Sequence, residues 1–197
     1  MAFIGMRHPV AAILNAHTPG SEPTYTAGTV LGHAIRGNLT VNRNNNPLYG
    51  DDVIVEDDNS VTSMQLEINT DDLLEDVESY VLGLVEKTIG SGQEAATEYI
   101  ETDASAPYVG TGYIRVRKKN GVVSYQGIWM YKVIFSKNGE ESQTKGENIQ
   151  WQTPTLQGRA AGIDVDGSGR LAFRKRRYFE TEAAAITWLN TLAVISQ

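Results

Sequence analysis

The sequence alternates along Tyr108-Val-Gly-Thr-Gly-Tyr-Ile-Arg-Val-Arg117, turns at Lys118-Lys-Asn-Gly121 and alternates again along Val122-Val-Ser-Tyr-Gln-Gly-Ile-Trp-Met-Tyr-Lys-Val-Ile-Phe135. The dipeptide Asn120-Gly121 is the strongest short signal for a β-hairpin, because a type I′ turn needs two consecutive residues that tolerate positive φ. With these two residues as the loop, Lys119 faces Val122 and Gly112 faces Trp129. We therefore predict one long antiparallel hairpin with a fixed register.

This register sorts the side chains of the hairpin onto two faces, because successive residues of a strand point to opposite sides. The first face is apolar and collects Ile114, Val116, Val123, Tyr125, Trp129, Tyr131, Val133 and Phe135. The second face carries Arg115 and Arg117, but also the apolar residues Tyr113, Ile128, Met130 and Ile134. A sheet that is apolar on both faces needs cover on both, either from its own chain or from another subunit.

Composition bounds the class of protein. The chain has 197 residues, which fits one domain with a sizeable core, and a net charge of −7, which argues against a general nucleic-acid binder. It has no cysteine, which excludes disulfides, thiolate metal sites and cysteine nucleophiles, and which is compatible with synthesis in the cytoplasm. The apolar run 10–14 is too short for a signal peptide core, and no stretch approaches the ~20 apolar residues of a membrane span. We expect no membrane insertion.

The remaining chain reads as further strands and two short helices. Strands are expected at about 3–14, 29–41, 61–69, 94–102, 149–158 and 170–179. Pro9 interrupts the first and predicts an edge position for it, while Pro154 predicts a bulged or peripheral strand. Helical spacing over 70–83, behind a Thr70-Asp71-Asp72 start, predicts one helix, and Thr181 caps a second at 182–194. The fold expected is mainly β, an antiparallel β-sandwich or partial barrel with one or two short flanking helices.

Residues 42–60 form a long excursion between two expected strands. Its segment 42–50 is polar and turn-rich, yet it carries two apolar residues, Leu48 and Tyr49, which we expect to be exposed. A short strand is possible at about 52–56. Loops of this length in a compact domain are usually functional or disordered.

Charge is unevenly distributed along the chain. Residues 51–78 hold eleven acidic residues and no Lys or Arg, whereas 170–177 hold five basic residues, Arg170, Arg174, Lys175, Arg176 and Arg177. Two independently solvated faces are the plainest reading. Contact between the opposite charges of neighbouring subunits is the second, and contact of the basic strand with nucleic acid is the third.

Candidate chemical motifs have structural explanations. Asp164-x-Asp-Gly-x-Gly resembles the front of a calcium loop, but position 175 is Lys and strands flank it, so we expect a plain turn. The acidic pairs at 51–52, 57–58 and 71–72 fit turns and helix starts better than glycosidase acids. His33 lies on an otherwise apolar strand face and reads as a core or interface histidine. No motif supports an enzyme, a metal site or a cofactor site, and we expect none of the three.

The residues laid out above resemble, in their order, the phage major tail proteins of the phi13 type, which build the tube of long non-contractile tails. The resemblance spans nearly the whole chain. It is carried by Leu48-Tyr-Gly50-Asp-Asp52, Asn69-Thr-Asp-Asp72, Ala106-Pro-Tyr-Val-Gly110 with Gly112-Tyr113 and Arg115, Asn120-Gly121, Tyr125, Trp129, Lys132-Val133, Gln143-Thr-Lys-Gly146, Ile149, Trp151-Gln-Thr-Pro154, Gly158, Phe179-x-Thr-x-Ala183 and Trp188-Leu-Asn190. The basic cluster 174–177 is less typical of this pattern, and the resemblance assigns it no role.

The resemblance implies a structural virion protein. It implies a single tail tube domain over 1–197, with an extended loop at about 42–60 and a C-terminal helix at about 181–194, that assembles as hexameric rings stacked into a tube. Implied partners are other copies of the chain, the tail terminator, tail tip or baseplate and tape measure proteins, and viral DNA passing through the lumen without sequence-specific binding. The implied location is the virion tail, assembled in the host cytoplasm.

Nine residues form the candidate assembly interface. They combine the apolar and acidic residues of the excursion, the apolar residues of the second hairpin face and two members of the basic strand: Leu48, Tyr49, Asp51, Asp52, Ile128, Met130, Ile134, Arg174 and Arg176. The acidic balance of the chain also suggests a negative lumen that repels the phosphates of passing DNA.

A non-viral β-sandwich module that binds carbohydrate or protein is the alternative. Trp129, Tyr131 and Trp151 are its candidate contact residues. The predicted register points Trp129 inward, which disfavours that residue as a sugar platform and leaves Trp151 open.

Overall fold

The computed structural model describes residues 2–90, 95–137, 139, 144 and 152–195. Its strands are β1 (Ala2–Ala16), β2 (Thr24–Val30), β3 (Ala34–Arg43), β4 (Asn46–Gly50), β5 (Val53–Asp58), β6 (Val61–Thr70), β7 (Val85–Ile89), β8 (Ala96–Ile100), β9 (Tyr108–Lys119), β10 (Val122–Ser136), β11 (Thr155–Ala160) and β12 (Arg174–Phe179). Its helices are α1 (Glu75–Leu82) and α2 (Glu182–Ala193). The fold is mainly β and antiparallel with two short helices, as predicted.

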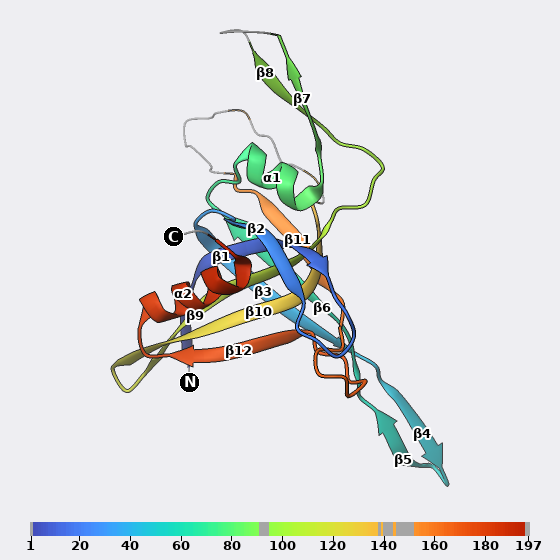
Figure 1. Cartoon of the computed structure of the whole chain (residues 1–197). Helices are drawn as coiled ribbons and strands as arrows, with labels where there is room; N and C mark the ends of the chain where they lie inside the picture. The colour runs from blue at the N-terminus through green and yellow to red at the C-terminus, as the bar shows by residue number, and fades with distance from the viewer. Residues whose placement is uncertain (1, 91–94, 138, 140–143, 145–151, 196–197) are drawn as a thin grey trace.

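The body of the protein is an eight-stranded sheet in the order β2-β1-β9-β10-β11-β6-β3, with β12 paired to β10 beside this path. Within the described residues the strands do not close into a barrel. Two hairpins, β4–β5 and β7–β8, form separate two-stranded sheets, and Figure 1 shows them extending from the body in different directions.

The central hairpin β9–β10 has the predicted turn and register. Asn120 and Gly121 adopt positive φ angles of 49° and 82°, as a type I′ turn requires. Lys119 pairs with Val122, and Gly112 pairs with Trp129. The dipeptide therefore sets which residues of the two strands face each other.

The predicted faces change sides near the end of β10. The register shifts between Met130 and Val133, so this part of the strand contains a β-bulge. Tyr131 stays with Trp129 on one face, whereas Val133 and Phe135 join the opposite face. The prediction that all four share one face was wrong, because strict alternation does not foresee an inserted residue.

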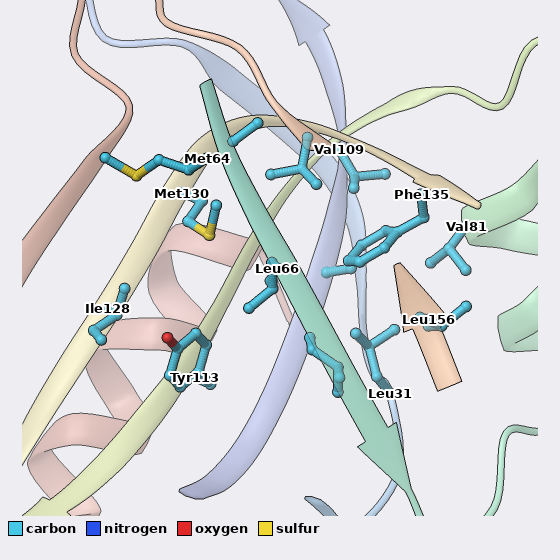
Figure 2. Close-up of a cluster of buried hydrophobic side chains, with 14 of the residues drawn as sticks. Leu31, Met64, Leu66, Val81, Val109, Tyr113, Ile128, Met130, Phe135 and Leu156 are labelled. Atoms are coloured by element: carbon cyan, nitrogen blue, oxygen red, sulfur yellow. The ribbon is translucent and has the colours of Figure 1, made fainter. Parts of the chain in front are cut away.

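One core lies between the β9–β10 hairpin and the strands β3, β6 and β11. Figure 2 shows Leu66, Leu156 and Phe135 converging from three strands, with Val81 of α1 at the edge of the cluster. Ile128 and Met130 are fully buried here, and Ile134 is half-buried. The expectation that Ile128 and Met130 form an assembly surface was wrong, because the sheet curls back and covers this face with its own strands.

A second core lies on the other face of the hairpin, under α2. Trp129 and Leu189 are both fully buried in it, and the Tyr25 ring meets the Trp129 ring edge-on with centroids 5.1 Å apart. The Tyr25 hydroxyl donates a hydrogen bond of 2.8 Å to the carbonyl oxygen of Tyr131. As predicted, Thr181 caps α2, where its hydroxyl accepts the backbone N–H of Ala184. Both faces of the hairpin are thus covered from within the chain.

The first strand departs from its predicted place. Its interruption near Pro9 is real, since His8 has a φ of 51° and the register with β9 shifts between Arg7 and Val10. Among the described residues, the predicted edge position holds for residues 2–7, which pair with β9 alone, and is wrong for residues 10–13, which pair with β2 on one side and β9 on the other. The bulge lets the strand accommodate the proline without leaving the sheet.

Several element boundaries also differ from prediction. The expected strand 29–41 is two strands, β2 and β3, and the strand β7 was missed. Helix α1 begins at Glu75, because the Asp71 and Asp72 carboxylates accept backbone N–H groups of His33 and Leu73 and hold the turn before it. β11 begins directly after Pro154, and β12 is shorter than the expected 170–179. The expected residues 149–151 lie outside the described part of the chain.

Gly112 tests the packing around Trp129. A Cβ at this position would lie 2.7 Å from the Trp129 ring and 2.7 Å from a Leu189 methyl, so we expect Gly112→Ala to destabilise the protein by about 1–3 kcal/mol, the cost of overpacking a core. Urea unfolding measures the change. Gly5→Ala is the matched control in β1, because a Cβ there meets nothing within 4 Å. Equal unfolding midpoints for the two variants would contradict this account of the core.

Tyr131 tests burial through alkaline pH. Burial raises the pKa of Tyr131 to about 12 from its ordinary value of 10.0, and raises the pKa of Tyr25 and Tyr113 as well. Between these two values the unfolded chain loses protons that the folded protein keeps, so stability is intact below pH 10.0 and falls as the pH rises toward about 12. We expect Tyr131→Phe to make this fall shallower in urea unfolding series at pH 8 and pH 11. An unchanged slope would show that Tyr131 does not contribute.

Candidate assembly surfaces

The excursion 42–60 is a β-hairpin arm that leaves the body of the protein (Figure 1). β4 and β5 pair antiparallel, and the tip is a turn at Asp51 and Asp52 with φ angles of 49° and 66°. The expected short strand at 52–56 is therefore part of a longer paired element, Val53–Asp58. Aspartate tolerates positive φ better than most residues, which explains an acidic pair at this tip.

The arm exposes its apolar side chains. The exposed fractions are 60% for Leu48, 63% for Tyr49, 66% for Val53, 53% for Ile54 and 68% for Val55. Single exposed apolar residues are ordinary, whereas a group of five on one projecting hairpin is typical of contact surfaces and makes the arm a candidate. Leu48 and Tyr49 are exposed, in agreement with the sequence, and the three apolar residues of β5 join them.

Hydrogen bonds hold the base of the arm to the body. The Asp58 carboxylate accepts the Asn44 side-chain amide at 2.7 Å and the Ser60 backbone N–H at 3.0 Å. Arg43 donates to the Asn59 carbonyl oxygen at 2.9 Å. The hydrogen bond from Asn44 is the main cause that lowers the pKa of Asp58 below its ordinary value. These hydrogen bonds fix the position of the two chain segments from which the arm extends.

A second exposed hairpin, β7–β8, follows α1. Its apolar side chains are also exposed, with Val85 at 49% and Tyr99 at 36%. In Figure 1 it projects at the end of the molecule away from β4–β5. Sequence reasoning placed a strand near β8 but missed β7, although the β-branched residues Val85, Thr88 and Ile89 ahead of Gly90 were a weak signal for it.

The basic strand β12 lies at a sheet edge. It pairs with β10 along one side only among the described residues. Arg176 and Arg177 are exposed, whereas Arg174 is half-buried, and burial lowers its pKa with a further contribution from Arg176. Lys175 donates to Glu22 at 2.7 Å. β12 therefore presents a row of positive charge beside unpaired backbone groups.

The acidic segment 51–78 and the basic strand do not meet within the described part of one copy. Of the ion pairs there, Lys175 binds Glu22 and Glu78 binds Lys137, the latter at 2.6 Å. Arg7 binds Glu182 at 2.7 Å. Of the predicted interface, the structure places Leu48, Tyr49, Asp51 and Asp52 on the arm and Arg174 and Arg176 on β12, while Ile128 and Met130 lie in the core.

A hollow of about 840 Å³ lies where β1, the β2–β3 connection and the starts of both helices meet. On its lining, Arg7 pairs with Glu182, and His33 pairs with Asp71 at 3.0 Å. The backbone N–H of His33 is the main cause that lowers the pKa of Asp71. The His33 side chain is 93% exposed, so of the two readings given to it, core or interface, the core reading was wrong and the interface reading stays a prediction. These charges hold neighbouring segments together.

The loop at Asp164 is a turn stabilised by its own backbone, as expected. The Asp164 carboxylate accepts the N–H groups of Gly167 at 2.8 Å and Gly169 at 3.2 Å. Asp166 in turn accepts the N–H of Ser168 at 3.0 Å. Over the described ranges, no group of three or more His, Cys, Asp or Glu side chains could hold a metal ion.

The aromatic residues of the alternative function do not form a surface platform. Trp129 is fully buried and Tyr131 is 4% exposed, both beneath α2. Trp151 lies outside the described residues. The predicted inward orientation of Trp129 is confirmed.

No protein-family model matches the chain, and no curated protein matches it. In the part of the chain that the structure describes, neither helix is long and apolar enough to cross a membrane.

Asp58 tests how the arm is anchored. We expect Asp58→Ala to speed amide hydrogen exchange across 46–58 at pH 7, because it removes the two hydrogen bonds that the Asp58 carboxylate accepts at the base of the arm. Since the folded pKa lies below the ordinary 3.8, the anchoring is present above pH 3.8 and is lost as the pH falls through the folded value. Asp57→Ala is the matched control, with a neighbouring carboxylate for which the structure shows no hydrogen bond. Faster exchange in both variants would contradict the assignment.

Proposed function

We propose that the protein is the major tail tube subunit of a long non-contractile phage tail, polymerising as stacked hexameric rings. The β4–β5 arm carries the proposal, because it projects five exposed apolar side chains that find no cover in one copy. A second copy that covers them returns about 25 cal/mol for each Å² of apolar surface removed from water. In a repetitive assembly this gain recurs in every subunit.

The arrangement of the covered and uncovered surfaces supports this proposal. The two cores bury both faces of the central hairpin within one chain, so the subunit body folds without a partner. The projecting hairpins and the edge strand β12 remain for contacts between copies. An arm that binds a different patch on its neighbour makes a head-to-tail contact, which closes into a ring or continues as a filament.

The remaining partners follow from the same role. In a tail the tube meets the tail terminator at one end, the tail tip or baseplate at the other, and encloses the tape measure protein and then viral DNA. A chain of net charge −7 suits a lumen that repels phosphate, so DNA slides through without binding. An assembled tube with Lys and Arg dominating its inner wall would contradict this last point. The proposed role is structural, with no catalysis.

Removing the apolar side chains of the arm tests the proposal. We expect the purified protein to form rings or tubes in negative-stain electron microscopy, and Leu48→Ser with Tyr49→Ser to remain a folded monomer, because both side chains are more than half exposed. Circular dichroism and urea unfolding check the fold of the variant.

A matched pair of substitutions controls for general loss of surface hydrophobicity. Val122→Ser with Leu171→Ser removes side chains that are 69% and 62% exposed but lie off the arm, and should assemble normally. Unfolding of the Leu48 and Tyr49 variant would assign these residues to the core instead. A parent protein that stays monomeric at high concentration would contradict the tail tube role.

A further inference from the structure

β5 of the arm and the basic edge strand β12 have the same length, and each has one edge of unpaired backbone groups. β5 and β12 each contain six residues. Among the described residues β5 pairs only with β4, and β12 pairs only with β10, so each keeps one edge of unpaired N–H and C=O groups. Such an edge accepts an added strand through main-chain hydrogen bonds. We propose that β5 of one copy adds to β12 of a neighbouring copy as an antiparallel strand, an inference that rests on the proposed tail tube function.

The side chains of the two strands are complementary in one direction only. The antiparallel alignment opposes Val53 with Phe179, Ile54 with Tyr178, Val55 with Arg177, Glu56 with Arg176, Asp57 with Lys175 and Asp58 with Arg174. It places three carboxylates opposite three cations and two aliphatic residues opposite two aromatic rings, both favourable cross-strand pairs. In the parallel alignment only one of the three carboxylates, that of Glu56, would meet a cation, Arg177, so charge selects the antiparallel direction.

The pairs in the middle of the alignment contribute most to this selection. Glu56 and Arg176 are both exposed, and among the described residues neither has an ion-pair partner in its own copy. Asp58 already holds the base of the arm, and Arg174 is half-buried. Lys175 keeps its bond to Glu22 while its ammonium group has further donors for Asp57.

The other free strand edges of the described chain lack this match. β4 contains Pro47, which has no N–H to donate, and it carries no charged side chain. β2 has no charged residue either. β7 holds Glu86 beside Lys87, so its charges largely cancel. β3 carries Arg36 and Arg43 seven positions apart, the one-sided half of β1 carries Arg7, and β8 carries Glu98. Among the free edges of the described chain, β5 alone presents three adjacent acidic residues and β12 alone presents four adjacent basic residues.

The contact must join different copies. In the chain itself β12 lies against β10 while the arm leaves the body in another direction (Figure 1). Because β5 and β12 are unlike surfaces, each copy offers one of each, and the contact repeats head-to-tail. A ring or filament therefore follows from a single kind of strand pairing, and many weak copies of it add up through multivalency.

Engineered cysteines test the register directly, since the parent chain contains none. The variant Ile54→Cys with Tyr178→Cys places two thiols on directly opposed residues of neighbouring copies. Under mild oxidation of assembled protein we expect disulfide-linked ladders that extend beyond the dimer on a denaturing gel. Ile54→Cys with Arg177→Cys is the control, because its thiols point to opposite faces and should link poorly. Strong linking in the control, or a ladder that stops at the dimer, would overturn the register or the head-to-tail arrangement.

A charge swap tests the pairing energetically. Glu56→Arg alone and Arg176→Glu alone each replace an attraction by a repulsion, so we expect the protein concentration for half-assembly to rise about three- to tenfold. Combining them should restore assembly to within about twofold of the parent value. Glu56→Arg with Arg177→Glu is the matched control that should not restore it. Failure of the Glu56 and Arg176 combination to restore assembly would overturn the proposal.

The outcomes separate this proposal from the tail tube function. Parent tubes with no ladder in the Ile54 and Tyr178 variant would leave the tail tube function standing and overturn the strand pairing. A parent protein that forms no higher assembly would count against both. If Arg176→Glu weakens binding of labelled duplex DNA while assembly is unchanged, the basic edge serves nucleic acid and the proposal is overturned.

Discussion

Burial of both faces of one long hairpin is the constraint on which the rest of the structure depends. The Asn120-Gly121 turn fixes the pairing of β9 with β10, and the two apolar faces that result cannot both be left in water. One face is covered by the curled sheet that ends in β3, and the other by α2. The strands β3, β6 and β11 and the helix α2 are therefore placed where they cover the two faces of the hairpin.

The bulge near Tyr131 makes this double cover possible. Without it, strict alternation would place Val133 and Phe135 on the same face as Trp129, toward α2. With the inserted residue, these side chains turn toward Leu156 and Val81 and extend the other core. β10 thus contributes side chains to both cores, with Trp129 and Tyr131 in the core under α2 and Val133 and Phe135 in the other.

Sequence reasoning reached the elements whose causes are local. The Asn-Gly turn, the strand expected at 61–69 and the cap at Thr181 each depend on residues adjacent in sequence, and each is present. The burial of Ile128 and Met130 could not be predicted, because it depends on how far a distant part of the sheet curls. The same distinction applies to the candidate surfaces. The exposure of Leu48 and Tyr49 could be predicted from their polar, turn-rich surroundings in the sequence. The edge position of β12 could not, because it depends on the order of strands in the whole sheet.

The acidic residues of the arm also affect how two free copies of the protein meet. A hairpin with Val53, Ile54 and Val55 on an open strand is a hazard, because such edges pair indiscriminately and aggregate. Two β5 strands that met antiparallel would set these aliphatic side chains against Glu56, Asp57 and Asp58, and the carboxylates of both arms would repel each other. The acidic residues of β5 therefore disfavour pairing between the arms of two copies. Salt screens charges, so this repulsion between two arms is strongest at low ionic strength.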